Sequence, residues 1–243
     1  MTRAWYANEK GYVENDGAKV YYEIYGEGET TVYLLPTWQI VHARHWKAQI
    51  PFLARHYRVI TSDHLGSGKS SRPEGLEFYT WDREVSDAIA VMDATGTDKA
   101  VAIGCSNGGN LALLLAAHHP QRMLGIIPIG AAAPVGPDHA HYPDFNRKLH
   151  RYEGWNRWNE TYMREHYRDF AEWFESEVFP EPHSTKQIED MVEWSQETTP
   201  DILIYGIAPS SSATPRIAWS CPWGPVCPRS AIGPSGISTS AAR

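Results

Sequence analysis

The residues best suited to chemistry lie in the segment Gly104-Cys105-Ser106-Asn107-Gly108-Gly109. The segment matches the pattern G-x-S-x-G, in which a sharp turn from a strand into a helix exposes a serine hydroxyl. An apolar run precedes the pattern and a helical pattern follows it. The first N–H groups of that helix would favour a developing oxyanion beside the serine. The sequence therefore predicts a nucleophilic role for Ser106, and a plain glycine-rich turn is the simpler alternative.

The elements that must position Ser106 alternate between strands and helices. Short β-type runs occupy residues 20–25, 31–35, 57–62, 99–105 and 124–129. Apolar residues at helical spacing occur in residues 42–56, 81–95 and 109–119. Such alternation predicts an α/β fold, with a mostly parallel sheet and helices on both of its faces.

Composition divides the chain into three regions. Residues 1–134 hold the alternating elements, and residues 135–200 form a charged, aromatic and helical segment that we interpret as a cap over one end of the sheet. Residues 201–243 begin with a short apolar run, 201–205, that we interpret as the start of a core strand. The remainder, from 207 onward, contains no Asp, Glu, Lys or His and is rich in Ser, Pro, Gly and Ala. This composition predicts a disordered or aberrant tail.

Several further segments resemble the α/β-hydrolase superfamily. Residues 46–51 resemble W-x-x-Q-I-P, and residues 57–70 resemble Y-R-V-I followed by D-x-R-G-x-G-x-S, with Leu65 in place of the usual arginine. Residues 119–122 resemble H-P-E-R. The resemblance covers about half of the chain. It implies an α/β-hydrolase fold, with residues 1–134 as the N-terminal part of the core, a helical cap and missing last strands.

The resemblance also implies the roles of several residues. The oxyanion would be held by the backbone N–H of Asn107 and by that of Trp38, although Pro36-Thr37 replaces the usual His-Gly before it. The implied function is a serine hydrolase of a small ester or related carbonyl compound, with an apolar pocket under the cap. Such an enzyme needs no cofactor.

The general base and acid of the triad are not evident. A serine hydroxyl needs an adjacent base that a carboxylate orients, and in this family the acid and the histidine follow the serine in the chain. No histidine follows His183. Asp138 is a conceivable acid and His139 or His141 a conceivable base, although such a base would break the usual order. For His42, His45 and His64 we expect structural or solvent-facing roles.

Two explanations fit the unusual C-terminal composition. A frameshift or truncation near Ile207 would replace the missing strands with residues read in another frame, and a natural linker is the alternative. The first explanation raises a second functional hypothesis, in which the protein is a non-catalytic, hydrolase-like remnant or ligand-binding domain.

Composition excludes several other classes. The formal charge of −7 and the absence of a basic cluster argue against nucleic-acid binding. No run approaches the roughly 20 apolar residues of a membrane span. Three cysteines do not form a disulfide framework, so we expect a cytoplasmic protein. The spacing of Cys221 and Cys227 does not suit zinc, and residues 66–70 lack the first glycine of a phosphate-binding loop. A small apolar molecule is the expected partner.

Overall fold

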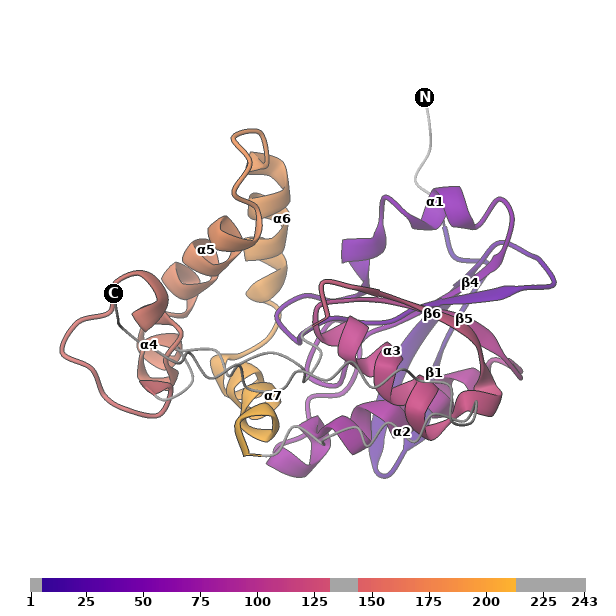
Figure 1. Ribbon diagram of the computed structural model, residues 1–243, viewed down its shortest axis with the longest axis horizontal. Helices are drawn as coiled ribbons and strands as arrows, with labels where there is room; N and C mark the ends of the chain where they lie inside the picture. Colours follow the sequence, from indigo (N-terminus) through magenta and orange to yellow (C-terminus); the bar gives the residue numbers. More distant parts are fainter. Residues whose placement is uncertain (1–5, 132–143, 213–243) are drawn as a thin grey trace, which may run out of the picture.

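A six-stranded mixed sheet forms the core of the right-hand part of the molecule in Figure 1, which shows a computed structural model that describes residues 6–131 and 144–212, with side chains to residue 207. The strand order is β1-β2-β4-β3-β5-β6. The strands are β1 (Glu9–Asn15), β2 (Ala18–Tyr25), β3 (Thr31–Leu34), β4 (Arg58–Ser62), β5 (Ala100–Cys105) and β6 (Met123–Ile129). Strands β3, β4, β5 and β6 run parallel, whereas β1 and β2 form an antiparallel edge.

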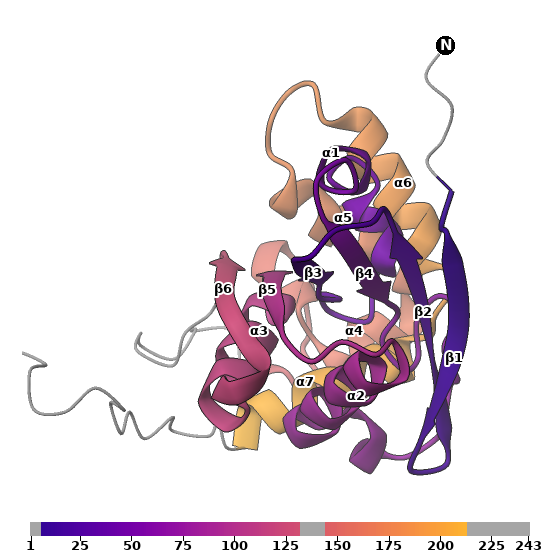
Figure 2. The ribbon, with the colours of Figure 1, turned by 90° about the vertical axis from the view of Figure 1, so that its right-hand side faces the viewer.

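Helices cover both faces of this sheet (Figure 2). On one face lie the short helices η1 (Ala43–Trp46) and α1 (Ile50–Leu53), and on the other lie α2 (Trp81–Ala94) and α3 (Asn107–His118). Successive residues of a strand point to opposite faces. Accordingly Val32 and Leu34 pack with Trp46, whereas Tyr33 packs with the apolar residues of α2 and α3. The predicted α/β architecture is confirmed.

The helical segment that follows β6 is also confirmed where the structure describes it. It contains η5 (Gly154–Arg157), α4 (Glu160–Glu165), α5 (Tyr167–Val178) and α6 (Thr185–Ser195), which gather beyond one end of the sheet (Figure 1). A buried aromatic cluster joins these helices to the loop after β3. The boundary expected at residue 134 lies outside the described residues.

The strand expected at residues 201–205 is wrong, because this segment belongs to helix α7 (Pro200–Ser212). Proline suits the first turn of a helix, and Asp201 in that turn interacts well with the helix dipole. The Thr199 hydroxyl accepts a hydrogen bond from the Ile202 amide at 3.4 Å, as in an N-terminal cap. A short apolar run does not by itself distinguish a strand from a buried helix.

Strand β6 forms one edge of the sheet, and no other described strand pairs with its outer side. Leu124, Ile127 and Ile129 of β6 are large apolar residues that remain exposed. The disordered tail expected from residue 207 onward is wrong for residues 207–212, which belong to α7, and the rest of it lies outside the described residues. Among the residues that the structure describes, no helix has the length and apolar character needed to cross a bilayer.

Candidate active site

Ser106 occupies the turn between β5 and α3, which is the place that the G-x-S-x-G pattern predicts. Its backbone has φ 54° and ψ −119°, and it is one of two non-glycine residues with positive φ in the described chain. The Ser106 amide donates to the Ile129 carbonyl oxygen at 2.8 Å, which ties the turn to β6. The side chain makes no capping hydrogen bond, and the residue is exposed. Backbone strain of this kind is common where a fold presents a reactive group.

The glycines of the pattern are required by close backbone packing. A β carbon at Gly104 would lie 1.9 Å from the Gly108 carbonyl oxygen, and one at Gly108 would lie 2.4 Å from the Pro36 carbonyl oxygen. Because backbone atoms on both sides are fixed by the sheet and the helix, neither position accepts a larger residue without a shift. The second contact places the loop after β3 directly against the start of α3.

That contact places the loop that carries Trp38 beside the start of α3, where Asn107 lies; these two residues are the expected oxyanion donors. Asn107 is the first residue of α3, and Trp38 lies two residues beyond Pro36. Neither amide donates a hydrogen bond to any described residue, so both remain available as donors. The neighbouring Cys105 is a poor alternative nucleophile, because burial raises the pKa of its thiol.

No described residue forms a hydrogen bond with the Ser106 hydroxyl, so the structure brings no base to it there. His42 is buried, and its Nε2 lies 3.5 Å from Glu197 Oε2 at the junction of core and cap. The ring of His45 is hydrogen-bonded to the His42 carbonyl group at 3.0 Å. Burial lowers the pKa of His45 to about 4 and that of His64 to about 3. The three histidines are largely enclosed by the protein and have local partners, as expected for structural roles.

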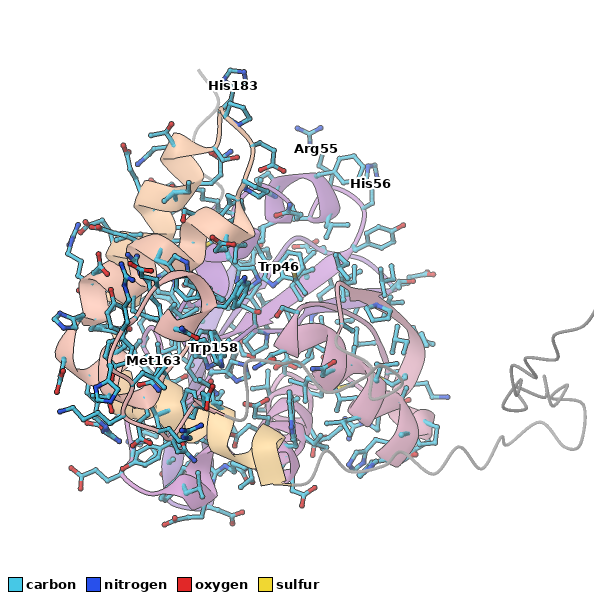
Figure 3. All side chains as sticks on the ribbon, turned by 60° about the vertical axis from the view of Figure 1, so that its left-hand side comes forward. Trp46, Arg55, His56, Trp158, Met163 and His183 are labelled. Carbon is cyan, nitrogen blue, oxygen red and sulfur yellow. The ribbon has the colours of Figure 1, made fainter. Side chains whose placement is uncertain are left out.

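The other candidates for acid and base are not brought to the serine. Asp138, His139 and His141 lie outside the described residues. His183, the last histidine of the sequence, is exposed at the tip of the loop between α5 and α6 (Figure 3). Among the described residues no group of three metal-ligating side chains is present.

Aromatic rings of the cap cover the side chain of Trp38. The ring centroids of Trp158 and Phe174 lie 5.1 and 5.4 Å from that of Trp38, and Phe170 contacts it edge-on at 6.4 Å. Figure 3 shows Trp158 on the side of the cap that faces the core. These rings pack against one another, which is the simpler of the two roles that aromatic residues at such spacings can have.

Buried polar residues on both sides of Trp38 were not anticipated from the sequence. The Gln39 side-chain amide donates to Glu84 Oε1 at 3.0 Å, and the His64 ring is hydrogen-bonded to the backbone of Thr37. The sequence did contain one indication that Glu84 is buried. It lies four residues before Ala88 and seven before Val91, which places it on the apolar side of α2. A carboxyl group in such a stripe is buried and needs a specific partner.

Comparison with known proteins identifies the family. A model of the alpha/beta hydrolase fold matches residues 30–197, which is more than half of the chain. The protein belongs to the alpha/beta hydrolase family. Its fold is accordingly the α/β-hydrolase fold that the sequence predicts, and its relatives are hydrolases.

The curated relatives are similar over a limited segment. A 2-hydroxymuconate semialdehyde hydrolase of Pseudomonas sp. strain CF600 is 40% identical over 88 residues, which are 36% of this chain and 31% of the relative. A Caulobacter segnis protein named as a carbamate hydrolase is 40% identical over 81 residues, 33% of this chain and 30% of the relative. The matched segments thus span about a third of the length of these relatives.

Solved structures match over most of the chain. The enol-lactonase of Burkholderia xenovorans has a TM-score of 0.65 at 20% identity, covering 84% of this chain and 74% of the lactonase. A hydrolase of Pseudomonas aeruginosa has a TM-score of 0.64 at 26% identity, covering 86% and 74%. An esterase of Exiguobacterium antarcticum has a TM-score of 0.66 at 21% identity, covering 82% and 72%. At such identities the lactonase and the esterase support the fold alone.

Proposed function

We propose that the protein is a serine hydrolase that transfers the acyl group of a small ester, or of a related carbonyl compound, to Ser106. One observation carries the proposal: Ser106 lies in a strained turn at the end of β5, immediately before the first helical amide of α3. Hydrolase relatives with names as different as semialdehyde hydrolase and carbamate hydrolase support a carbonyl substrate without selecting one.

In the proposed reaction the Ser106 oxygen attacks the carbonyl carbon of the ester. The negative charge that develops on the carbonyl oxygen is stabilised by the amides of Asn107 and Trp38 and by the positive end of the α3 dipole. The tetrahedral intermediate collapses to an acyl-serine and releases the alcohol. No metal or organic cofactor takes part in this scheme.

The proton of the Ser106 hydroxyl passes to water in this proposal. No described residue accepts it, and hydrolases without a working base keep only the part of the rate that the oxyanion hole and substrate binding supply. We therefore propose slow acylation and still slower release of the acyl group. The lack of a proton acceptor for Ser106 among the described residues also favours a second candidate, a non-catalytic hydrolase-like domain that binds a small apolar ligand.

A stopped-flow assay with p-nitrophenyl acetate distinguishes the two candidates. For the hydrolase we expect release of about one equivalent of nitrophenolate per chain, followed by a much slower steady phase, because acylation and deacylation are separate steps. The Ser106→Ala variant should lose the first phase. Equal rates in the wild type and in Ser106→Ala would contradict the hydrolase and favour the binding domain.

A further inference from the structure

Two buried side chains hold the residues on either side of Trp38. Glu84 accepts a hydrogen bond from the Gln39 side-chain amide at 3.0 Å, and the His64 ring is hydrogen-bonded to the backbone of Thr37. Their exposed fractions are 7% for His64, 8% for Glu84 and 1% for Gln39. Because Trp38 lies between Thr37 and Gln39, the two contacts restrict the backbone that carries its amide.

Each of the two supporting side chains also has one buried atom without a partner. These atoms are Nε2 of His64 and Oε2 of Glu84, which form no hydrogen bond with any described residue. The hydrogen bond to the Thr37 backbone raises the pKa of the His64 ring, so it favours the protonated ring. A bond that does so is one in which a ring N–H donates, and its acceptor is therefore the Thr37 carbonyl oxygen. The donor is Nδ1, since Nε2 is unpartnered, and in a neutral ring Nε2 is then an acceptor.

The protonation states of His64 and Glu84 make the two free atoms complementary. Burial lowers the pKa of His64 to about 3, so its ring is neutral at physiological pH. Burial raises the pKa of Glu84 to about 8, so its carboxyl is protonated at neutral pH. With Oε1 accepting from Gln39, the proton resides on Oε2. A donor on Glu84 and an acceptor on His64 are therefore both unused.

Both residues line the same small cavity. Its other walls include Tyr33, Ser62 and Leu111, and it admits the centre of a water molecule over ≈ 10 Å³. A buried water needs about that much room and two or more polar partners. The Oε2 proton and the Nε2 lone pair supply one donor and one acceptor.

We propose that Glu84 and His64 are positioning residues for the Trp38 amide, joined to each other through one water molecule in the cavity between them. The chain of hydrogen bonds runs from the Thr37 carbonyl through His64, the water and Glu84 to the side chain of Gln39. It fixes both neighbours of Trp38 from inside the core. The inference rests on the proposed function in one respect, namely that the Trp38 amide is an oxyanion donor.

The groups that face Glu84 from every side determine how it responds to pH. Asp87 on α2 is bound by Arg83 and Asn15, at 2.9 and 2.8 Å. The loop after β4 contributes His64 and Asp63, β3 contributes Tyr33, and the loop after β3 contributes Gln39. No cation is in direct contact with Glu84 among the described residues. Loss of its proton at alkaline pH therefore leaves a buried negative charge and removes the donor to the water.

Nitrogen-15 NMR of the whole protein between pH 5.5 and 9.5 tests the proposal. The Gln39 side-chain amide and the Trp38 backbone amide should shift together, with a midpoint near pH 8. Glu84→Gln keeps a donor and an acceptor and should abolish that transition. Glu84→Met removes both and should give the Trp38 amide an altered shift at every pH. Glu175→Gln is the matched control, since Glu175 is a buried carboxyl of α5 outside the cavity lining, and it should keep the transition.

A second readout follows Ser106 itself. The rate at which a fluorophosphonate labels Ser106 should fall roughly two- to tenfold in Glu84→Met, as expected when one hydrogen bond is lost, and remain near wild type in Glu84→Gln. A Trp38 amide that does not follow the Gln39 transition overturns the inference, as does a transition that persists in Glu84→Gln. Absence of labelling in the wild type overturns the proposed function instead, and the NMR result then decides the positioning role alone.

Discussion

The α carbon of Gly108 contacts the backbone of Pro36 so closely that a β carbon on Gly108 would lie 2.4 Å from the Pro36 carbonyl oxygen. This contact joins the start of α3 to the loop that carries Trp38. The relative position of the two proposed oxyanion donors thus depends on a residue without a side chain. Because the atom that a methyl group would meet belongs to the backbone, it cannot move aside as the end of a flexible side chain could.

We therefore expect Gly108→Ala to destabilise the protein by about 1–3 kcal/mol, the usual cost of overpacking a well-packed region. Urea denaturation measures the change. Gly125→Ala is the matched control, because a β carbon at Gly125 on β6 meets no atom within 4 Å. A Gly108→Ala variant as stable as Gly125→Ala would show that the loop is not packed against α3 as described.

The backbone of Ser106 gives a second prediction. Its φ of 54° is unfavourable for residues with a β carbon and unrestricted for glycine. Ser106→Gly and Ser106→Ala both remove the hydroxyl, but only glycine relieves the strain. We expect Ser106→Gly to be about 1 kcal/mol more stable than Ser106→Ala in urea denaturation. Equal stabilities, or a more stable alanine variant, would contradict a strained turn.

The parts of the fold that were predictable are those in which local pattern and tertiary environment agree. The run Ala100–Cys105 is apolar and lies between two parallel strands, with alternate residues buried, and the glycine pattern around Ser106 is typical of a tight turn, so the position of Ser106 followed from the sequence. Strand β1 (Glu9–Asn15) was not anticipated from the sequence. It lies at the edge of the sheet and its residues are largely exposed, so the alternation of apolar and polar residues along it is weak.

The parts that were missed depend on contacts between distant segments. Residues 201–205 are apolar enough for a strand or a helix, and the proline and the threonine before them direct the chain into α7. In the candidate site, Ser106 and Asn107 are adjacent in sequence and were both expected. The support of Gln39 by Glu84 joins residues 45 positions apart, and nothing in the sequence indicates that pairing.

The stability of the protein should fall as the pH rises through neutrality. Burial raises the pKa of Glu175 to about 7 and that of Glu84 to about 8, from a usual 4.5. Between 4.5 and these values the folded state holds protons that the unfolded state releases, which makes unfolding easier as the pH rises. Below about pH 6.5 the lowered pKa values of His45 and His64 act in the opposite direction, so the net fall is expected from about pH 6.5 to pH 8. The loss of folding stability caused by each carboxyl should exceed about 1 kcal/mol, since one pKa unit corresponds to 1.36 kcal/mol.

Melting temperatures measured from pH 6.5 to pH 9 check this expectation, because the histidines with lowered pKa values are neutral in both the folded and the unfolded state over most of that range. Relative to the wild type, Glu175→Gln should remove the part of the fall that ends near pH 7, and Glu84→Gln should remove the part that ends near pH 8, because glutamine stays neutral throughout. The burial of Asp63 and Asp87 also raises the pKa of each, so a residual slope of the same sign should remain in the double variant. A melting temperature that rises from pH 6.5 to pH 8 would contradict this expectation.

A buried hydrogen bond between the core and the cap gives a fourth prediction. The Thr198 hydroxyl donates to the Gly66 carbonyl oxygen at 2.6 Å, and the neighbouring Glu197 carbonyl accepts from Arg72 at 2.8 Å. Thr198→Val keeps the shape of the side chain but leaves the Gly66 carbonyl unpaired, at an expected cost of about 1–2 kcal/mol. Limited proteolysis should cut the segment before α7 faster in this variant.

Thr198→Ser is the control for that experiment, since it keeps the hydroxyl and loses only a methyl group. Its rate of cleavage should stay close to that of the wild type. If valine and serine at position 198 have the same effect, the hydrogen bond to Gly66 does not hold the cap to the core.

The most direct test of the central claim is the site at which a fluorophosphonate probe modifies the protein. Because Ser106 is exposed and, in our proposal, the amides of Asn107 and Trp38 stabilise the oxyanion, we expect one adduct per chain, located by peptide mass spectrometry on Ser106 and absent from Ser106→Ala. An adduct on another residue, or unchanged labelling of Ser106→Ala, would contradict the assignment of Ser106 as the nucleophile.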